Sequence, residues 1–282
     1  MGRDELKVYA KESLDLIKTG VYKDKSGKEY NIKEDLKNMQ VGTCCYIKSK
    51  NSLNLVDESE SENAKNLYGL DNCKIYLSTK DTLDAVKGQV EKFGSSCGLN
   101  FASAKHPGGG FENGAKAQEE DLCYSSTLFG SLNRCKSLYD YSRENLNKNL
   151  YSTWSIYSPN VVIYRDKLKN KISPVVCSMI SSPAPNKGAY LGKNQDVRKA
   201  LEERCEYILQ TAVKHGEKNL VLGAFGCGVF KNSPMEVATV WFNLLYRKNY
   251  AKYFDNIEFA ILGRGDDENY KAFKMVFLRK FS

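Results

Sequence analysis

From Lys74 onward, short apolar segments typical of strands alternate with longer segments whose apolar residues recur at helical spacing. The expected strands are 74–78, 99–102, 161–164, 175–180, 219–224 and 257–262, and the expected helices are 82–93, 115–129, 196–214, 235–245 and 267–277. This alternation predicts an α/β fold with a mainly parallel sheet that helices cover on both faces. Ligands of such sheets bind at the carboxyl ends of the strands, where loops lead into helices.

The segment before residue 74 is more polar. Residues 4–18 show helical spacing and are followed by Gly20, a typical helix stop, and 49–64 is a candidate mobile loop. We expect residues 1–70 to form an accessory region packed on a core of residues 71–282, the two making one continuous domain. No apolar run approaches the roughly 20 residues that a membrane span requires, so no membrane association is expected.

A first glycine-rich loop follows the expected strand that ends at Ala102. It contains three consecutive glycines, and after a seven-residue spacer a predicted helix begins with Gln118, Glu119 and Glu120. Glycines let a backbone approach a ligand closely and direct its N–H groups inward. Two adjacent carboxylates beside such a loop would place acid–base chemistry next to a phosphate or a sugar.

A second glycine-rich loop, Gly226-Cys227-Gly228, follows the expected strand 219–224. Ser233 and Pro234 then have the character of an N-cap and a first helical residue. A strand, a glycine loop and a helix N-terminus together favour anion binding, because free amides and the helix dipole both attract phosphate. A Walker loop is excluded, since Val229 stands where that motif requires Lys.

Composition excludes several classes of site. With only His106 and His215, a zinc site made of three histidines is impossible, and His106 could either contact a ligand or stabilise its loop. The nine scattered cysteines contain no C-x-x-C pair, so reduced thiols and an intracellular (cytoplasmic or nuclear) protein are expected. The net charge of +8 permits a polyanionic ligand, although it could also reflect only a lysine-rich surface.

Together, Asn100–Thr127 and Leu222–Pro234 closely resemble the two signature loops of the microbial type of poly(ADP-ribose) glycohydrolase, a branch of the macrodomain superfamily. The stretch Ser182–Asn186 also resembles one common in this branch, and the likeness spans about residues 74–277. The resemblance implies a macrodomain-like three-layer α/β/α sandwich with a mixed, mainly parallel central sheet and an N-terminal helical extension. It implies hydrolysis of the ribose–ribose O-glycosidic bond of poly(ADP-ribose), releasing ADP-ribose, with no metal and no cofactor.

The resemblance also implies roles for single residues. Glu120 would be the catalytic acid and then activate water, Glu119 would hold ribose hydroxyls, and Gln118 would help to position that end of the ligand. The other implied substrate-binding residues are Asn100, Gly108, Gly109, Gly110, Gly226, Cys227, Gly228, Val229 and Phe230. Adjacent helix positions point about 100° apart, so the two carboxyls can have separate roles.

Two alternatives remain open at this point. One is a macrodomain that binds ADP-ribose without cleaving it, against which the Gln118–Glu120 set argues. The other is a hydrolase that removes single ADP-ribose groups from protein or from a nucleobase in DNA. The expected partners are poly(ADP-ribose), ADP-ribose and ADP-ribosylated proteins, with ADP-ribosylated nucleic acid left open, and the protein is expected to be a monomer.

Overall fold

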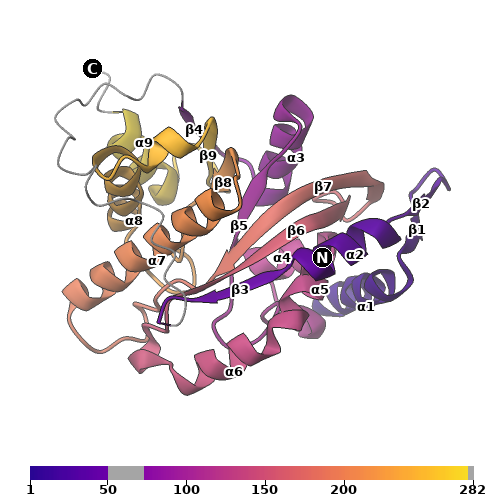
Figure 1. Ribbon diagram of the computed structural model, residues 1–282, viewed down its shortest axis with the longest axis horizontal. Coiled ribbons are helices and arrows are strands. Elements are labelled where there is room, and N and C mark those ends of the chain that lie inside the picture. The colour runs from indigo at the N-terminus through magenta and orange to yellow at the C-terminus, as the bar shows by residue number, and fades with distance from the viewer. Residues whose placement is uncertain (50–72, 279–282) are drawn as a thin grey trace.

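The computed structural model describes residues 1–49 and 73–278. In these residues a seven-stranded sheet has the order β3-β6-β7-β5-β8-β9-β4 (Figure 1). Its strands are β3 (Cys44–Ile47), β4 (Lys74–Ser78), β5 (Cys97–Phe101), β6 (Trp154–Arg165), β7 (Lys171–Ser182), β8 (Asn219–Leu222) and β9 (Asn256–Ala260). The pairs from β7 to β4 are parallel, whereas β3–β6 and β6–β7 are antiparallel. The predicted mixed, mainly parallel sheet is therefore confirmed.

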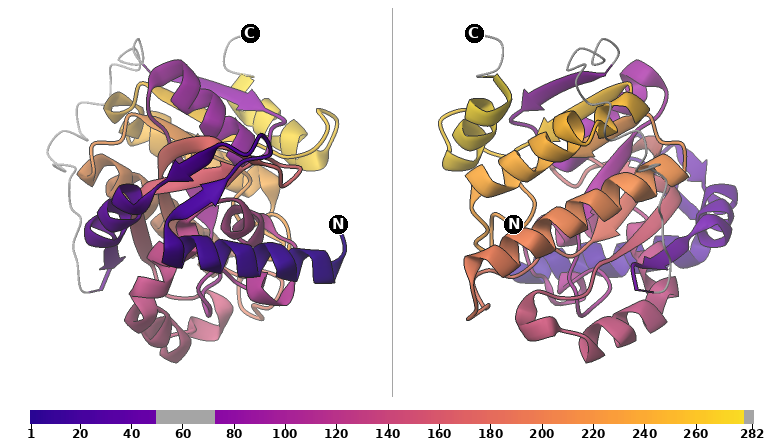
Figure 2. Two further views of the ribbon diagram at one scale, coloured as in Figure 1. Left: turned by 90° about the vertical axis from the view of Figure 1, so that its right-hand side faces the viewer. Right: turned by 60° about the vertical axis from the view of Figure 1, so that its left-hand side comes forward.

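Helices cover both faces of this sheet. They are α1 (Arg3–Thr19), α2 (Lys33–Gly42), α3 (Thr82–Phe93), α4 (Gln118–Ser125), α5 (Leu128–Leu132), α6 (Lys136–Glu144), α7 (Asn194–Lys214), α8 (Pro234–Phe242) and α9 (Glu268–Leu278). Apolar residues of α1 to α6 form one buried cluster, and those of α7 to α9 form another. Figure 2 shows α1 and α7 on opposite sides of the sheet, which makes the three-layer sandwich.

Smaller elements complete the described chain. β1 (Val21–Lys23) and β2 (Glu29–Asn31) form a separate antiparallel pair. Short 3₁₀ turns are η2 (Phe111–Asn113), η3 (Asn133–Cys135), η4 (Asn147–Asn149) and η6 (Tyr250–Tyr253), and a π-helical turn, η5 (Asn243–Arg247), extends α8. Among the residues described, no helix combines the length and the apolar character needed to cross a membrane.

Several predicted helix ends are confirmed in detail. Gly20 ends α1 in the left-handed conformation, with φ of 69°. The Asp81 side chain accepts a hydrogen bond from the Asp84 N–H at 2.7 Å and so caps α3. Ser233 and Pro234 begin α8 as expected. These local signals act through the first or last turn of a helix, so they can be recognised without the rest of the fold.

The helix predicted over residues 115–129 is instead divided into α4 and α5. Ser126 is extended, and Thr127 is held by β6: its N–H donates to the Val162 carbonyl and its hydroxyl accepts from the Val162 N–H, both at 3.0 Å. These hydrogen bonds to the sheet therefore break the helix at a point where the apolar spacing alone predicts that it continues. Except for Ser49, the mobile loop predicted for residues 49–64 lies outside the described residues.

The expectation that all cysteines are reduced is wrong for two of the nine. Cys45 of β3 and Cys135 of η3 form a disulfide, with their Cα atoms 6.4 Å apart. The two residues are 90 positions apart in sequence, and Cys45 lies on an edge strand that the sheet holds through its pairing with β6. The spacing of cysteines in the chain therefore gave no indication of this pair.

Candidate active site

A cavity of about 1520 Å³ lies at the carboxyl ends of β5 and β9, between the two glycine-rich loops. Nine of the predicted site residues line it, namely Gly109, Gly110, Gln118, Glu119, Glu120, Gly226, Gly228, Val229 and Phe230. The other three predicted site residues, Asn100, Gly108 and Cys227, are described by the structure but are not among the lining residues. The two sequence motifs are more than a hundred positions apart, and the fold brings them to a single cavity, as predicted.

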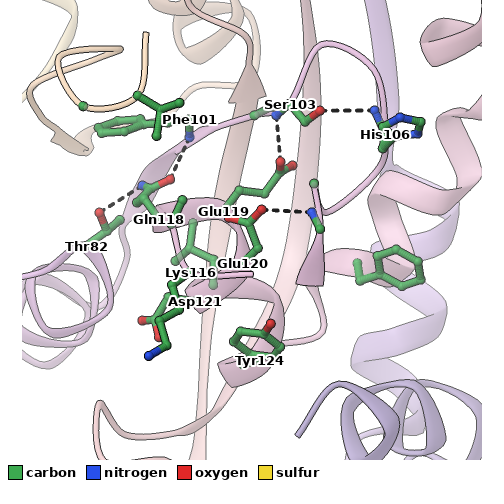
Figure 3. A pocket seen from close by; sticks show the side chains of 18 of the residues that line it. Thr82, Phe101, Ser103, His106, Lys116, Gln118, Glu119, Glu120, Asp121 and Tyr124 are labelled. Atoms are coloured by element: carbon green, nitrogen blue, oxygen red, sulfur yellow. Dashed lines mark hydrogen bonds between the residues drawn. The ribbon is translucent and has the colours of Figure 1, made fainter. Parts of the chain in front are cut away.

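The side chain of Gln118 connects the start of α4 to the end of β5 through hydrogen bonds. Its Oε1 accepts from the Phe101 N–H at 2.8 Å, and its Nε2 donates to the Leu99 carbonyl at 2.7 Å and to the Thr82 hydroxyl at 3.0 Å (Figure 3). These partners fix the orientation of the amide, because a backbone N–H requires an acceptor and a carbonyl requires a donor. Gln118 therefore positions the two glutamates that follow it.

Glu119 is only 3% exposed and is held by groups from the first loop. Its Oε2 accepts from the Ser103 N–H at 2.7 Å, and its Oε1 accepts from Asn100 Nδ2 at 3.3 Å. Burial raises the pKa of Glu119 to about 8, and the neighbouring Glu120 adds to this while the two hydrogen bonds oppose it. At neutral pH this side chain can therefore carry a proton and donate a hydrogen bond.

Glu120 points to the glycine triplet, and its Oε1 accepts from the Gly110 N–H at 2.9 Å (Figure 3). Gly109 has a φ of 58°, and a Cβ added there would lie 2.4 Å from Glu120 Oε1. A side chain at position 109 would therefore displace this carboxyl as well as strain the backbone. Only glycine lets the loop close against both glutamates.

The second loop presents unpaired amides to the cavity. Gly226 has a φ of 73°, and a Cβ there would lie 2.4 Å from Asn232 Nδ2, which itself donates to the Pro185 carbonyl at 2.9 Å. Four N–H groups of this loop have no hydrogen-bond acceptor within residues 1–49 and 73–278. They belong to Gly226, Gly228, Val229 and Phe230. The Cys227 N–H instead donates to the Ala224 carbonyl at 3.1 Å, so it closes the turn.

Free amides grouped in a glycine-rich turn form a concave site that favours an anion. Phe225 supports this loop from below, with its ring 5.6 Å from that of Phe101 in an edge-on arrangement. Val229 is 80% exposed at the cavity mouth. The arrangement can hold a diphosphate through the backbone alone.

The first loop owes its shape to backbone contacts. The His106 N–H donates to Ser103 Oγ at 3.2 Å, and its carbonyl accepts from the Gly109 N–H at 3.0 Å. His106 is one of the residues that line the cavity, so both of the roles considered for it agree with its position. The Tyr124 hydroxyl of α4 lies within 2.9 Å of the Phe111 and Ala115 carbonyls and joins the helix to the same loop.

Sequence reasoning missed the walls that α6, α1 and the residues just before α1 supply. Met1 and Leu6 line the cavity, and Arg3 Nε donates to the Asn113 carbonyl at 2.8 Å. From α6, Tyr139 lines the cavity and Arg143 Nη1 donates to the Lys105 carbonyl at 2.7 Å. No local pattern distinguishes these residues, because each acts from an element outside the two motifs. In the part of the chain that the structure describes, no three His, Cys, Asp or Glu residues are grouped to hold a metal ion.

Comparison with solved structures gives close matches over nearly the whole chain. The poly(ADP-ribose) glycohydrolase of Thermomonospora curvata is 32% identical with a TM-score of 0.86, and the match covers 97% of this chain and 100% of that one. The same enzyme bound to the inhibitor ADP-HPD gives 32% identity and a TM-score of 0.85 over the same shares. The Deinococcus radiodurans poly(ADP-ribose) glycohydrolase in complex with ADP-ribose is 33% identical with a TM-score of 0.73, covering 86% of this chain and 97% of that one.

Comparison with curated proteins gave no match. The family model described as microbial-type PARG, catalytic domain, matches residues 10–166, which is more than half of the chain and includes the first loop and both glutamates. The structural matches, at above 30% identity, extend the likeness through the second loop. The chain therefore belongs to the microbial-type poly(ADP-ribose) glycohydrolase (PARG) family and is a catalytic domain of that family.

Proposed function

We propose that this protein hydrolyses the ribose–ribose O-glycosidic bonds of poly(ADP-ribose) and releases ADP-ribose. The observation that carries the proposal is the single cavity that is lined both by Glu120 and by the second loop with its free amides. A diphosphate held by those amides would extend its terminal ribose towards the two glutamates. Membership of the family and the ADP-ribose complex of the Deinococcus radiodurans enzyme support the same ligand.

In this mechanism Glu120 is the general acid. Its carboxyl protonates the oxygen of the departing ribose while the C1″–O bond breaks and an oxocarbenium-like sugar forms. The resulting carboxylate, which accepts from the Gly110 N–H, then takes a proton from the water that attacks C1″. The proton given to the leaving group is thus recovered, and Glu120 returns to its starting state.

The other site residues hold the substrate. Glu119 faces the ribose hydroxyls, Asn100 holds Glu119 in place through its amide, and Phe230 packs against the ribose at the cavity mouth. The amides of Gly228 and Val229 bind the diphosphate, a role that free backbone N–H groups can fill. We further propose that the protein acts as a monomer on poly(ADP-ribose) and on ADP-ribosylated proteins.

The direct test is Glu120→Gln, which keeps the shape of the side chain and removes the transferable proton. Loss of a general acid typically costs 10²- to 10⁴-fold, so we expect kcat for ADP-ribose release to fall by about that factor. Calorimetry should show that the affinity for ADP-ribose is nearly unchanged. The control is Glu112→Gln, an exposed carboxyl that lines the same cavity, for which kcat should stay close to the original value.

Normal turnover by the Glu120→Gln variant would refute the mechanism. The wild-type assay should compare polymer, protein carrying single ADP-ribose groups, and ADP-ribosylated DNA. Product from either of the last two, but not from polymer, would change the substrate assignment. Tight binding of ADP-ribose with no product from any of the three would indicate a binding module.

A further inference from the structure

Two buried polar atoms beside Glu119 have no hydrogen-bond partner among the described residues. They are the Tyr139 hydroxyl and Asn100 Oδ1. A buried polar group without a partner costs about 1–3 kcal/mol, so most such groups in folded proteins are paired. Two of them next to one carboxyl of the cavity indicate that a ligand completes the arrangement.

Asn100 lies near the end of β5, and only the nitrogen of its side-chain amide has hydrogen-bond partners among the described residues. Its Nδ2 donates to Glu119 Oε1 at 3.3 Å and to Ser181 Oγ at 3.0 Å. Both hydrogens of the amide are therefore used, and the oxygen remains as an acceptor. This acceptor is completely buried beside Glu119, where solvent cannot satisfy it.

Tyr139 of α6 lines the cavity and is only 1% exposed. Its ring packs edge-on against Trp154 with centroids 5.5 Å apart, and Trp154 Nε1 donates to Ser142 Oγ at 3.1 Å. The ring is therefore held in place and cannot turn to another partner. Burial, together with the nearby Glu119 and Cys123, raises the pKa of Tyr139, so the hydroxyl keeps its proton and acts as a donor.

The Tyr139 hydroxyl is thus a donor and Asn100 Oδ1 an acceptor, and both lie close to the Glu119 carboxyl. That carboxyl can itself donate or accept a hydrogen bond. A sugar hydroxyl both donates and accepts, so its chemistry matches this combination, whereas a phosphate oxygen only accepts. We propose that Tyr139 determines specificity for the terminal ribose by donating its hydroxyl hydrogen to a ribose hydroxyl that Glu119, oriented by Asn100, also holds. The inference rests on the proposed function in taking ADP-ribose as the ligand.

Tyr139→Phe tests this with two ligands, ADP-ribose and ADP, which lacks the terminal ribose. Loss of one hydrogen bond should weaken ADP-ribose binding about 3- to 10-fold in calorimetry and leave ADP binding unchanged. The thermal midpoint should stay the same or rise, because the variant removes an unpaired buried hydroxyl. Ser78→Ala is the matched control: Ser78 Oγ is also buried without a partner but lies outside the cavity lining, so only stability should respond.

Equal affinity of wild type and Tyr139→Phe for ADP-ribose would overturn the inference. So would an equal loss for ADP and ADP-ribose, or a lowered thermal midpoint, since each would indicate a structural role for the hydroxyl. The proposed function is tested separately by product release from polymer. If the wild type releases no ADP-ribose but Tyr139→Phe selectively loses affinity for it, the proposed activity fails and this inference stands.

Discussion

Glu119 is almost completely buried, and its carboxyl has a different proton affinity in the folded and unfolded chain. Its folded pKa is raised to about 8, chiefly by burial, from a reference value of 4.5. Between these two values the folded protein binds the proton more tightly than the unfolded chain does. The contribution of Glu119 to stability is therefore present below about pH 4.5 and is lost as pH rises towards 8.

Glu119→Gln should remove this dependence, because the amide is neutral at every pH. The free energy of unfolding of the wild type should fall relative to the variant as pH rises from about 5 to 8, by on the order of 1 kcal/mol per pH unit at most. Urea denaturation of both proteins at several pH values measures the difference. A difference that stays constant over this range would show that the proton affinity of Glu119 is ordinary.

At the scale of single residues, the sequence predicted which residues come together at the cavity. It did not predict the contacts that each of them makes there. Gly109 was expected to let a ligand approach, and the structure adds that any Cβ would collide with Glu120. Gln118 was expected near the ligand, and all of its polar groups turn out to bind the protein. Such roles depend on distances of a few ångströms across the fold, which spacing along the chain does not contain.

Helix α7 lies behind the sheet, yet it helps to shape the cavity through Arg204. This fully buried guanidinium donates to the Pro183 carbonyl, to the Leu150 and Tyr151 carbonyls at 3.3 Å each, and to Thr153 Oγ1 at 3.3 Å. Tyr151 has a φ of 61°, a conformation that bulky residues rarely adopt without support. Its ring lies 6.0 Å from that of Phe230, a residue of the cavity mouth, so α7 supports this wall from behind.

Arg204→Met should destabilise the protein by about 3–5 kcal/mol, because three buried carbonyls lose their donors together. Arg198→Met on the same helix is the control, since Arg198 is exposed and its Nε donates to Glu202 Oε1 at 3.2 Å, and it should cost less than about 0.5 kcal/mol. Chemical denaturation monitored by circular dichroism measures both. A loss below about 1 kcal/mol for Arg204→Met would mean that the carbonyls find other donors.

At the scale of helices and strands, a boundary was predictable where the residues that set it lie within one turn of it. Asp81 and Gly20 mark a helix start and a helix end by contacts within one turn, and both are confirmed. The break between α4 and α5 was missed because β6, more than thirty positions further along, supplies the backbone partner of Thr127. The cavity walls from α1 and α6 were missed for the same reason, since tertiary contacts alone bring them to the site.

At the scale of the whole molecule, the two faces of the sheet carry separate apolar clusters that share its strands. The cluster on the α1 side contains Leu6 and Met39 from the N-terminal segment together with Trp154 of β6. The cluster on the other side contains Trp241 of α8. Because β3 also pairs with β6, we propose that residues 1–70 and 71–282 unfold as one cooperative unit rather than as two.

The chain's two tryptophans allow this to be measured, since one lies in each cluster. Trp241→Phe leaves Trp154 as the reporter of the face that the N-terminal helices cover, and Trp154→Phe leaves Trp241 as the reporter of the other face. In each variant the fluorescence and far-ultraviolet circular dichroism transitions in urea should have the same midpoint and slope, because a shared sheet cannot lose one covering layer and keep the other. If the Trp154 signal changed at lower urea than the circular dichroism signal, the N-terminal region would be a separately unfolding unit. The cavity walls contributed by Met1 and Leu6 would then be lost before the core that carries Glu120.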